Sequence, residues 1–127
     1  MKVLLIEDNA RNRYLATFLL EQHGHGVVHA ETGSEGLALA AEIHPDVILL
    51  DIQLPGMDGY AVARRLKGDP ALASIPIVAV TSYAMVGDRE KCIEAGAEGY
   101  IEKPIEPATF VSEVENFVRR QARAERS

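Results

Sequence analysis

The stretch "DVILLDIQLPG", from Asp46 to Gly56, places an acidic residue at the end of an apolar run. Residues 47–50 are four consecutive apolar side chains, which is typical of a strand buried on both faces. Asp51 follows at once, although Asp is a poor strand residue and an unpaired buried charge is costly. The stretch therefore predicts a carboxylate whose charge other groups must compensate.

Short apolar runs alternate with helix-like segments along the rest of the chain. The apolar runs predict strands, and the segments between them have helical spacing, often with glycine at the end. This alternation predicts an α/β fold: a doubly wound, five-stranded parallel sheet with helices on both faces. The predicted strands are 2–6, 27–30, 47–50, 75–81 and 99–103, and the predicted helices are 10–24, 34–43, 58–68, 87–96 and 107–123.

Several residues mark the ends and faces of these helices. Asn9 and Asp58 are candidate N-caps, and Gly24 is a candidate C-cap. We expect the apolar positions of the first helix to be Tyr14, Leu15, Phe18 and Leu19.

Composition limits the class of protein. The 127 residues suit one domain, expected over 1–120 with a polar tail over 121–127. Cys92 is the single cysteine, so no internal disulfide is possible, which fits a reducing cytoplasm. The opening "MKVLLIEDN" is too short for a signal peptide core, and no segment has membrane-spanning length. A net charge of −6 argues against nucleic acid as a direct partner.

Polar residues end the predicted strands. Glu7 and Asp8 follow the first strand, Asp51 the third, Thr81 ends the fourth and Lys103 the fifth. Ligands bind at this carboxyl edge of an open parallel sheet, so these side chains should converge there. Adjacent strands are about 4.8 Å apart, and carboxylates that close repel one another. A hard cation such as Mg²⁺, with an ammonium nearby, would relieve the repulsion.

A carboxylate in this setting can also act as a nucleophile. Aspartyl phosphates are a known form of covalent catalysis, and phosphoryl transfer depends on positioning and charge neutralisation. Mg²⁺, Lys103 and the Thr81 hydroxyl would supply the neutralisation around Asp51.

Four segments together resemble the receiver domain of two-component response regulators, over residues 2 to about 118. They are "LLIEDN", "VILLDIQLPGMDG", "VAVTSYA" and "GYIEKPI". The resemblance implies that Asp51 accepts a phosphoryl group from a histidine kinase or a histidine phosphotransfer protein. It also implies that Thr81 and Lys103 contact the phosphoryl group, and that the sheet order is 2-1-3-4-5.

The resemblance further implies a metal site and a switch. Mg²⁺ would be held by Asp8 and Asp51, by Glu7 mostly through water, and by the backbone carbonyl of Gln53. The Lys103–Pro104 bond would be cis. Thr81 would move toward the phosphate and Tyr100 would rotate inward. The face formed by the fourth helix, fifth strand and fifth helix would then change its affinity for a downstream protein target.

Two further residues bear on the lifetime of the phosphorylated state. Gln53 and Tyr83 would flank the path of the attacking water, and a bulky Tyr83 would slow hydrolysis. The segment "TSYAMVGDREKC" resembles stand-alone regulators of the polar-differentiation, DivK-like type and also the receiver domains of hybrid kinases.

The sequence leaves three other readings to weigh. The chain could be the receiver fragment of a larger response regulator or hybrid kinase. A phosphohydrolase of the haloacid-dehalogenase type needs an acid two residues after the nucleophile, where this chain has Gln53. A flavodoxin-like cofactor binder needs a phosphate-cradling loop, where this chain has the acidic "EDNARN". We therefore expect a signalling switch, not an enzyme with a substrate of its own.

The four histidines do not have the spacing of a metal site. His23 and His25 lie in a glycine-rich "HGHG" segment, and all four, with His29 and His44, are expected to be solvated loop residues.

Overall fold

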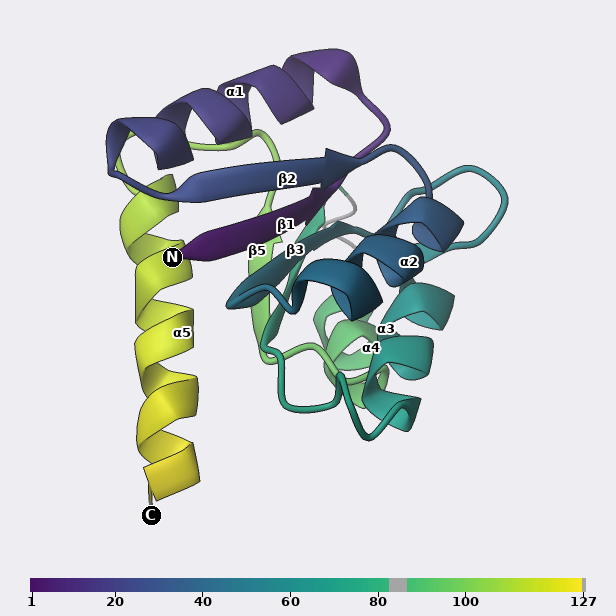
Figure 1. The fold of residues 1–127 in the computed structure, drawn as a ribbon. Helices are drawn as coiled ribbons and strands as arrows, with labels where there is room; N and C mark the ends of the chain where they lie inside the picture. Colours follow the sequence, from purple (N-terminus) through teal and green to yellow (C-terminus); the bar gives the residue numbers. More distant parts are fainter. Residues whose placement is uncertain (83–86, 127) are drawn as a thin grey trace.

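A computed structural model describes residues 1–82 and 87–126, and it shows five parallel strands and five helices in strict alternation (Figure 1). The elements are β1 Lys2–Ile6, α1 Ala10–Gln22, β2 Gly26–Ala30, α2 Gly33–Ile43, β3 Val47–Asp51, α3 Gly59–Gly68, β4 Ile77–Thr81, α4 Asp88–Glu94, β5 Gly99–Glu102 and α5 Phe110–Arg126.

The sheet has the order β2-β1-β3-β4-β5, which confirms the predicted doubly wound topology. All four strand pairings are parallel. Strands β3 and β4 are buried at every residue, as expected for strands covered on both faces. The order places β1 and β3 side by side, so the residues that follow these two strands meet at one edge.

Two apolar layers hold the helices against the sheet. One face packs against α2, α3 and α4 through residues such as Ala40, Val62 and Cys92. The other face packs against α1 and α5 through residues such as Leu20 and Phe110. Figure 1 shows these two groups of helices on opposite sides of the sheet. The sheet is therefore covered by helices on both faces.

Both predicted N-caps are confirmed, but the C-cap of α1 is His23, one residue before the predicted Gly24, whose φ is 84°. Some helix boundaries also differ from the prediction. Asn9 accepts a hydrogen bond from the Asn12 amide, and Asp58 accepts one from the Ala61 amide. Helix α5 begins three residues later than predicted, at Phe110, whose amide bonds the carbonyl of Glu106. It also continues to Arg126, through most of the segment expected to be a polar tail.

The predicted helix is confirmed as α1, but its apolar positions do not all face the sheet. Leu19 is buried, but the inward positions are Ala16, Leu19 and Leu20, while Tyr14 is 74 % exposed and Phe18 is 48 % exposed. Periodicity alone could not choose between these faces, because the small Ala16 can pack against the sheet where an aromatic ring cannot. The rings of Tyr14 and Phe18 stack on each other at the surface, with centroids 6.3 Å apart.

Cys92 is buried in the core, where it packs as a small apolar residue. The prediction of solvated loop histidines is wrong for His25, whose Nε2 lies 2.8 Å from Glu115 with little exposure. It is also wrong for the position of His29, which lies within β2. Among the described residues, no helix has the length and apolar character needed to span a bilayer.

Candidate metal and phosphoacceptor site

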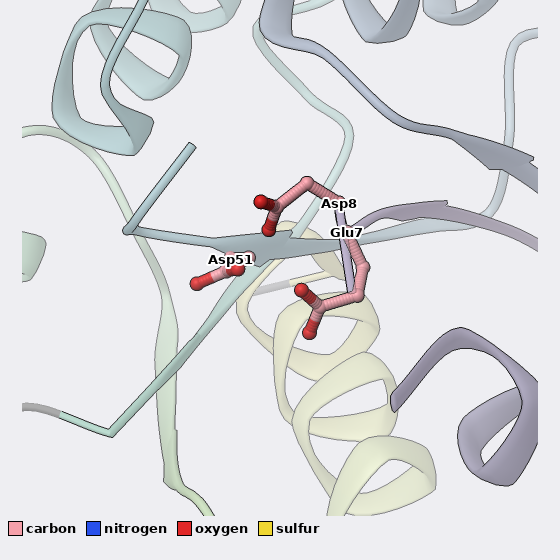
Figure 2. Close-up of side chains that lie close together, drawn as sticks. All are labelled: Glu7, Asp8 and Asp51. Carbon is pink, nitrogen blue, oxygen red and sulfur yellow. The ribbon is translucent and has the colours of Figure 1, made fainter. Parts of the chain in front are cut away.

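The carboxylates of Glu7, Asp8 and Asp51 meet at the carboxyl edge of the sheet. One oxygen from each lies within 4.8 Å of the other two (Figure 2). Glu7 and Asp8 follow β1, and Asp51 ends the neighbouring β3, so the strand order explains the cluster. Glu7 and Asp51 are each 3 % exposed, whereas Asp8 is exposed. The predicted convergence of these three residues is confirmed.

Lys103 directly follows β5 and approaches the same cluster. Its Nζ lies 2.6 Å from Glu7 Oε1 and 3.3 Å from Asp51 Oδ2. The Lys103 amide donates to the Thr81 carbonyl at 2.8 Å, which ties the lysine loop to the end of β4. The Lys103–Pro104 peptide bond is cis, as predicted. One ammonium therefore partly offsets the charge of two buried carboxylates.

The loop after β3 is fixed tightly around Asp51. The Gln53 amide donates to Asp51 Oδ1 at 2.9 Å, and the Gln53 side chain accepts a 2.6 Å hydrogen bond from Ser82. A Cβ at Gly59 would lie 2.7 Å from the Asp51 carbonyl oxygen, so only glycine lets α3 begin this close to the loop. These contacts hold the Asp51 carboxylate toward the open side of the edge.

The open side is a hollow with a mostly polar lining. Predicted site residues line it, together with Asn9, which was predicted only as a helix cap, and with Asn12 and Ser82, for which the sequence predicted no role. The lining residues are Glu7, Asp8, Asn9, Ala10, Asn12, Asp51, Gln53, Ser82, Lys103 and Pro104.

Thr81 and Tyr100 lie outside that lining. Thr81 is 1 % exposed at the end of β4. Tyr100 is half-buried on β5 and packs against the core shared by α3 and α4. The prediction for Tyr83 lies outside the described residues. Movement of Thr81 and rotation of Tyr100 stay predictions.

The surroundings of Asp51 disfavour the charged form of its carboxylate. Burial, followed by a hydrogen bond with Glu7, raises the pKa of Asp51 from 3.8 to about 6. The Gln53 amide and the Lys103 ammonium act in the opposite direction, and they do not cancel the increase. The folded protein therefore holds the Asp51 proton more tightly than the unfolded chain does.

This shift predicts how stability depends on pH in metal-free protein. The folded pKa lies above the unfolded one, so the contribution of Asp51 is full below about pH 4 and is lost as pH rises through about 6. Asp51→Asn, which stays neutral and can still accept the Gln53 hydrogen bond, should raise the free energy of unfolding by about 2–3 kcal/mol at neutral pH. The gain should vanish toward pH 4.

Urea denaturation with a chelator present, at several pH values, measures this difference. Glu42→Gln is the control, because it removes one exposed carboxylate from α2 and should show no such pH dependence. If Asp51→Asn were no more stable than the parent at neutral pH, the raised pKa of Asp51 in the folded protein would be contradicted.

The donor set fits a hard divalent ion. All three carboxylates offer oxygen, the ligand atom that Mg²⁺ prefers, and the exposed Asp8 lies where hydrated metal can reach it. Both Glu7 oxygens already have partners, since Oε1 pairs with Lys103 and Oε2 accepts from the Asn9 amide at 3.3 Å. The expected role of Glu7, mostly through water, stays a prediction.

Comparisons with known proteins agree with this arrangement. The family model of the response regulator receiver domain matches residues 3–115. The chain is 42 % identical to the polar-differentiation response regulator DivK of Brucella ovis over 116 residues, 91 % of this chain and 94 % of that protein. It is 41 % identical to the DivK of Brucella anthropi, with the same coverage.

Solved structures with the same fold include two receiver domains. A CheY-like response regulator receiver domain protein from Methanospirillum hungatei superposes with a TM-score of 0.88 at 26 % identity, covering 97 % of each chain. The receiver domain of a Pseudomonas aeruginosa sensor histidine kinase superposes with a TM-score of 0.85 at 31 % identity, covering 93 % of this chain and 97 % of that one. That structure has a magnesium ion coordinated in its active site cleft.

Proposed function

The chain belongs to the response regulator receiver domain family, and from that premise we propose that it is a phosphorylation-dependent switch in which Asp51 is the phosphoacceptor. The observation that carries the proposal is the cluster itself. A buried Asp51 carboxylate ends β3 with its oxygens facing a polar hollow, beside two further carboxylates and the Lys103 ammonium.

These residues would act together in the transfer of a phosphoryl group to Asp51. An Asp51 carboxylate oxygen attacks phosphorus, the bond from phosphorus to the donor's imidazole nitrogen breaks, and its electron pair returns to that nitrogen. Lys103, whose ammonium pairs with Glu7 in this structure, would then pair with the incoming phosphoryl oxygens. The Thr81 hydroxyl, at the neighbouring strand end, would bond the phosphate once formed.

Mg²⁺ fits beside these groups. Asp8, Asp51 and the Gln53 carbonyl would hold it directly, with Glu7 mostly through water. Bound there, it would neutralise charge on the phosphoryl oxygens.

The proposed output is a change in partner affinity, without turnover of a substrate. Receiver domains of this family act between histidine kinases and downstream targets. The phosphate on Asp51 would draw Thr81 inward and let Tyr100 rotate, and the face formed by α4, β5 and α5 would change. Beyond slow hydrolysis of its own aspartyl phosphate, we propose no catalytic activity for this chain.

Phosphorylation itself is the test of this function. Incubation with acetyl phosphate and Mg²⁺ should add one phosphoryl group, observable by intact mass spectrometry. Omission of Mg²⁺ in the presence of a chelator should prevent it. Unchanged labelling in the chelator would contradict the proposed role of the metal.

The exposed aromatic pair on α1 indicates where a histidine donor would dock. Tyr14 and Phe18 line a groove beside the phosphoacceptor hollow, and Ala10 lines both. Exposed aromatic residues are frequent anchors in protein interfaces. A donor seated on this groove would hold its phosphohistidine close to Asp51.

The double substitution Tyr14→Ser and Phe18→Ser tests the docking groove. It should lower phosphotransfer from the cognate kinase by about tenfold or more, and leave labelling by acetyl phosphate unchanged, because that small donor needs no docking surface. Profiling the purified histidine kinases of the source organism identifies the donor. Ile93→Ser, at another exposed apolar residue on α4, is the control. Equal phosphotransfer by the double variant and the parent would exclude this groove.

A further inference from the structure

We propose that Arg13, on α1, is a positioning residue for the metal site, because its side chain fixes the backbone of the loop that carries Glu7 and Asp8. The inference rests on the proposed function, since it concerns how the same site is assembled. Arg13 does not line the phosphoacceptor hollow, so it would act through the loop and not on the phosphoryl group.

The contacts of Arg13 are with main-chain oxygens. Its Nη1 lies 3.0 Å from the Glu7 carbonyl oxygen and 2.9 Å from the Asp8 carbonyl oxygen, and it donates to both. Its Nη2 pairs with Glu31 Oε1 at 3.0 Å. The Arg13 side chain as a whole is 15 % exposed, whereas the Glu31 side chain is 62 % exposed. The contact with the Glu7 carbonyl is partly buried, whereas the contact with the Asp8 carbonyl and the ion pair with Glu31 lie at the surface.

These contacts add to the backbone hydrogen bonds that fix the short loop between β1 and α1. The Glu7 amide donates to the Ala30 carbonyl at 2.9 Å, and the Arg13 amide donates to the Asn9 carbonyl at 3.0 Å. With both carbonyls of Glu7 and Asp8 held from the α1 side, the loop has little freedom to turn. The carboxylates are thereby directed toward Asp51 on the other side.

Repulsion between the three carboxylates explains why the loop after β1 needs the support of Arg13. Three carboxylates within 4.8 Å repel one another before metal binds, and the exposed Asp8 is the one free to move away. A guanidinium can bond both carbonyls and a carboxylate at once, because its donors form a rigid fork. Lysine cannot reproduce this, since its ammonium is a point charge on a flexible stem.

The test compares Mg²⁺ binding by Arg13 variants of the full chain. Isothermal titration calorimetry should show about tenfold weaker binding for Arg13→Gln, the scale typical of lost outer-shell support, and an intermediate loss for Arg13→Lys. Two controls are matched. Arg11→Gln removes the same charge from an exposed position on the same helix, and Glu31→Gln removes the surface ion pair but keeps the carbonyl contacts. Both should bind Mg²⁺ within about twofold of the parent.

A second readout uses metal-free protein and needs no activity. Amide hydrogen exchange over residues 7–9 should be faster in Arg13→Gln than in the parent, while exchange in β3 and β4 stays unchanged. Equal Mg²⁺ affinity in parent and Arg13→Gln, or equal exchange over residues 7–9, would overturn the role of Arg13. Failure of the parent itself to bind Mg²⁺ would instead overturn the proposed function, so the two failures are distinguishable.

Discussion

Asp51→Asn should abolish phosphorylation of this chain by acetyl phosphate. The substitution replaces a nucleophilic carboxylate by an amide of nearly the same shape, which can still accept the hydrogen bond from the Gln53 amide. Loss of a nucleophile with the rest of a site intact typically lowers rates by at least about 10³-fold. We therefore expect no phosphoryl group in the intact mass at times that saturate the parent.

Asp46→Asn is the matched control for this experiment. Asp46 directly precedes β3, whereas Asp51 ends it, so the two aspartates lie at opposite ends of one strand. Asp46 is exposed and accepts a hydrogen bond from the Lys2 amide. The control should be phosphorylated as the parent is. Labelling of Asp51→Asn to the parent's extent would show that another residue is the acceptor. Asp51→Ala should give the same loss.

Lys103→Ala should separate phosphorylation from its consequence. Lys103 contacts Glu7 and Asp51 now, and its own amide bonds the Thr81 carbonyl at the end of β4. Without the ammonium, Asp51 can still be labelled, more slowly, because Mg²⁺ would still neutralise part of the charge. The link from the phosphate to β5, and hence to Tyr100, would be lost. We expect partner binding that depends on phosphorylation to fall by about tenfold or more.

A pull-down with fluoroberyllate-loaded and unloaded protein measures that coupling. The parent should capture its downstream target from lysate in one state and not in the other, and Lys103→Ala should not distinguish the states. Arg64→Ala, which removes an exposed cation from α3, should behave as the parent does. Full discrimination by Lys103→Ala would remove this lysine from the coupling.

The sheet could be predicted because its strands are short runs of mostly apolar residues in the sequence. Val47 to Leu50 could form little else than a buried strand, and the polar residue after each run marked the carboxyl edge. Parallel pairing then brought Glu7, Asp8, Asp51 and Lys103 together, whatever their separation in sequence. This is why both the fold and most of the candidate site could be predicted.

Contacts that depend on side-chain direction could not be predicted. Arg13 reads as an ordinary polar residue of an amphipathic helix, and only the close approach of α1 to the loop after β1 shows it bonding two carbonyls. The hydrogen bond from Ser82 to Gln53 joins two strand ends and has no sequence signal. Asn12, by contrast, had a usable signal, since it lies three residues after the Asn9 cap and so faces the hollow.

The exposed aromatic residues of α1 and the first residue of α5 show a second limit of prediction from sequence. Apolar spacing favours burial of Tyr14 and Phe18, yet the structure exposes both, because neighbouring small and aliphatic residues already fill the interface with the sheet. The start of α5 at Phe110 depends on the hydrogen bond to Glu106, which local propensity does not specify. Exposed aromatic residues on a helix that adjoins the site are the kind of departure that function explains.

Mg²⁺ titration of the metal-free protein by calorimetry tests the central claim most directly, namely that Glu7, Asp8 and Asp51 form one cation site. We predict a single binding event in the parent at neutral pH, which is lost in Asp8→Asn and weakens as pH falls below about 6, where Asp51 takes up a proton. No heat of binding in the parent, or equal binding by Asp8→Asn, would contradict the account.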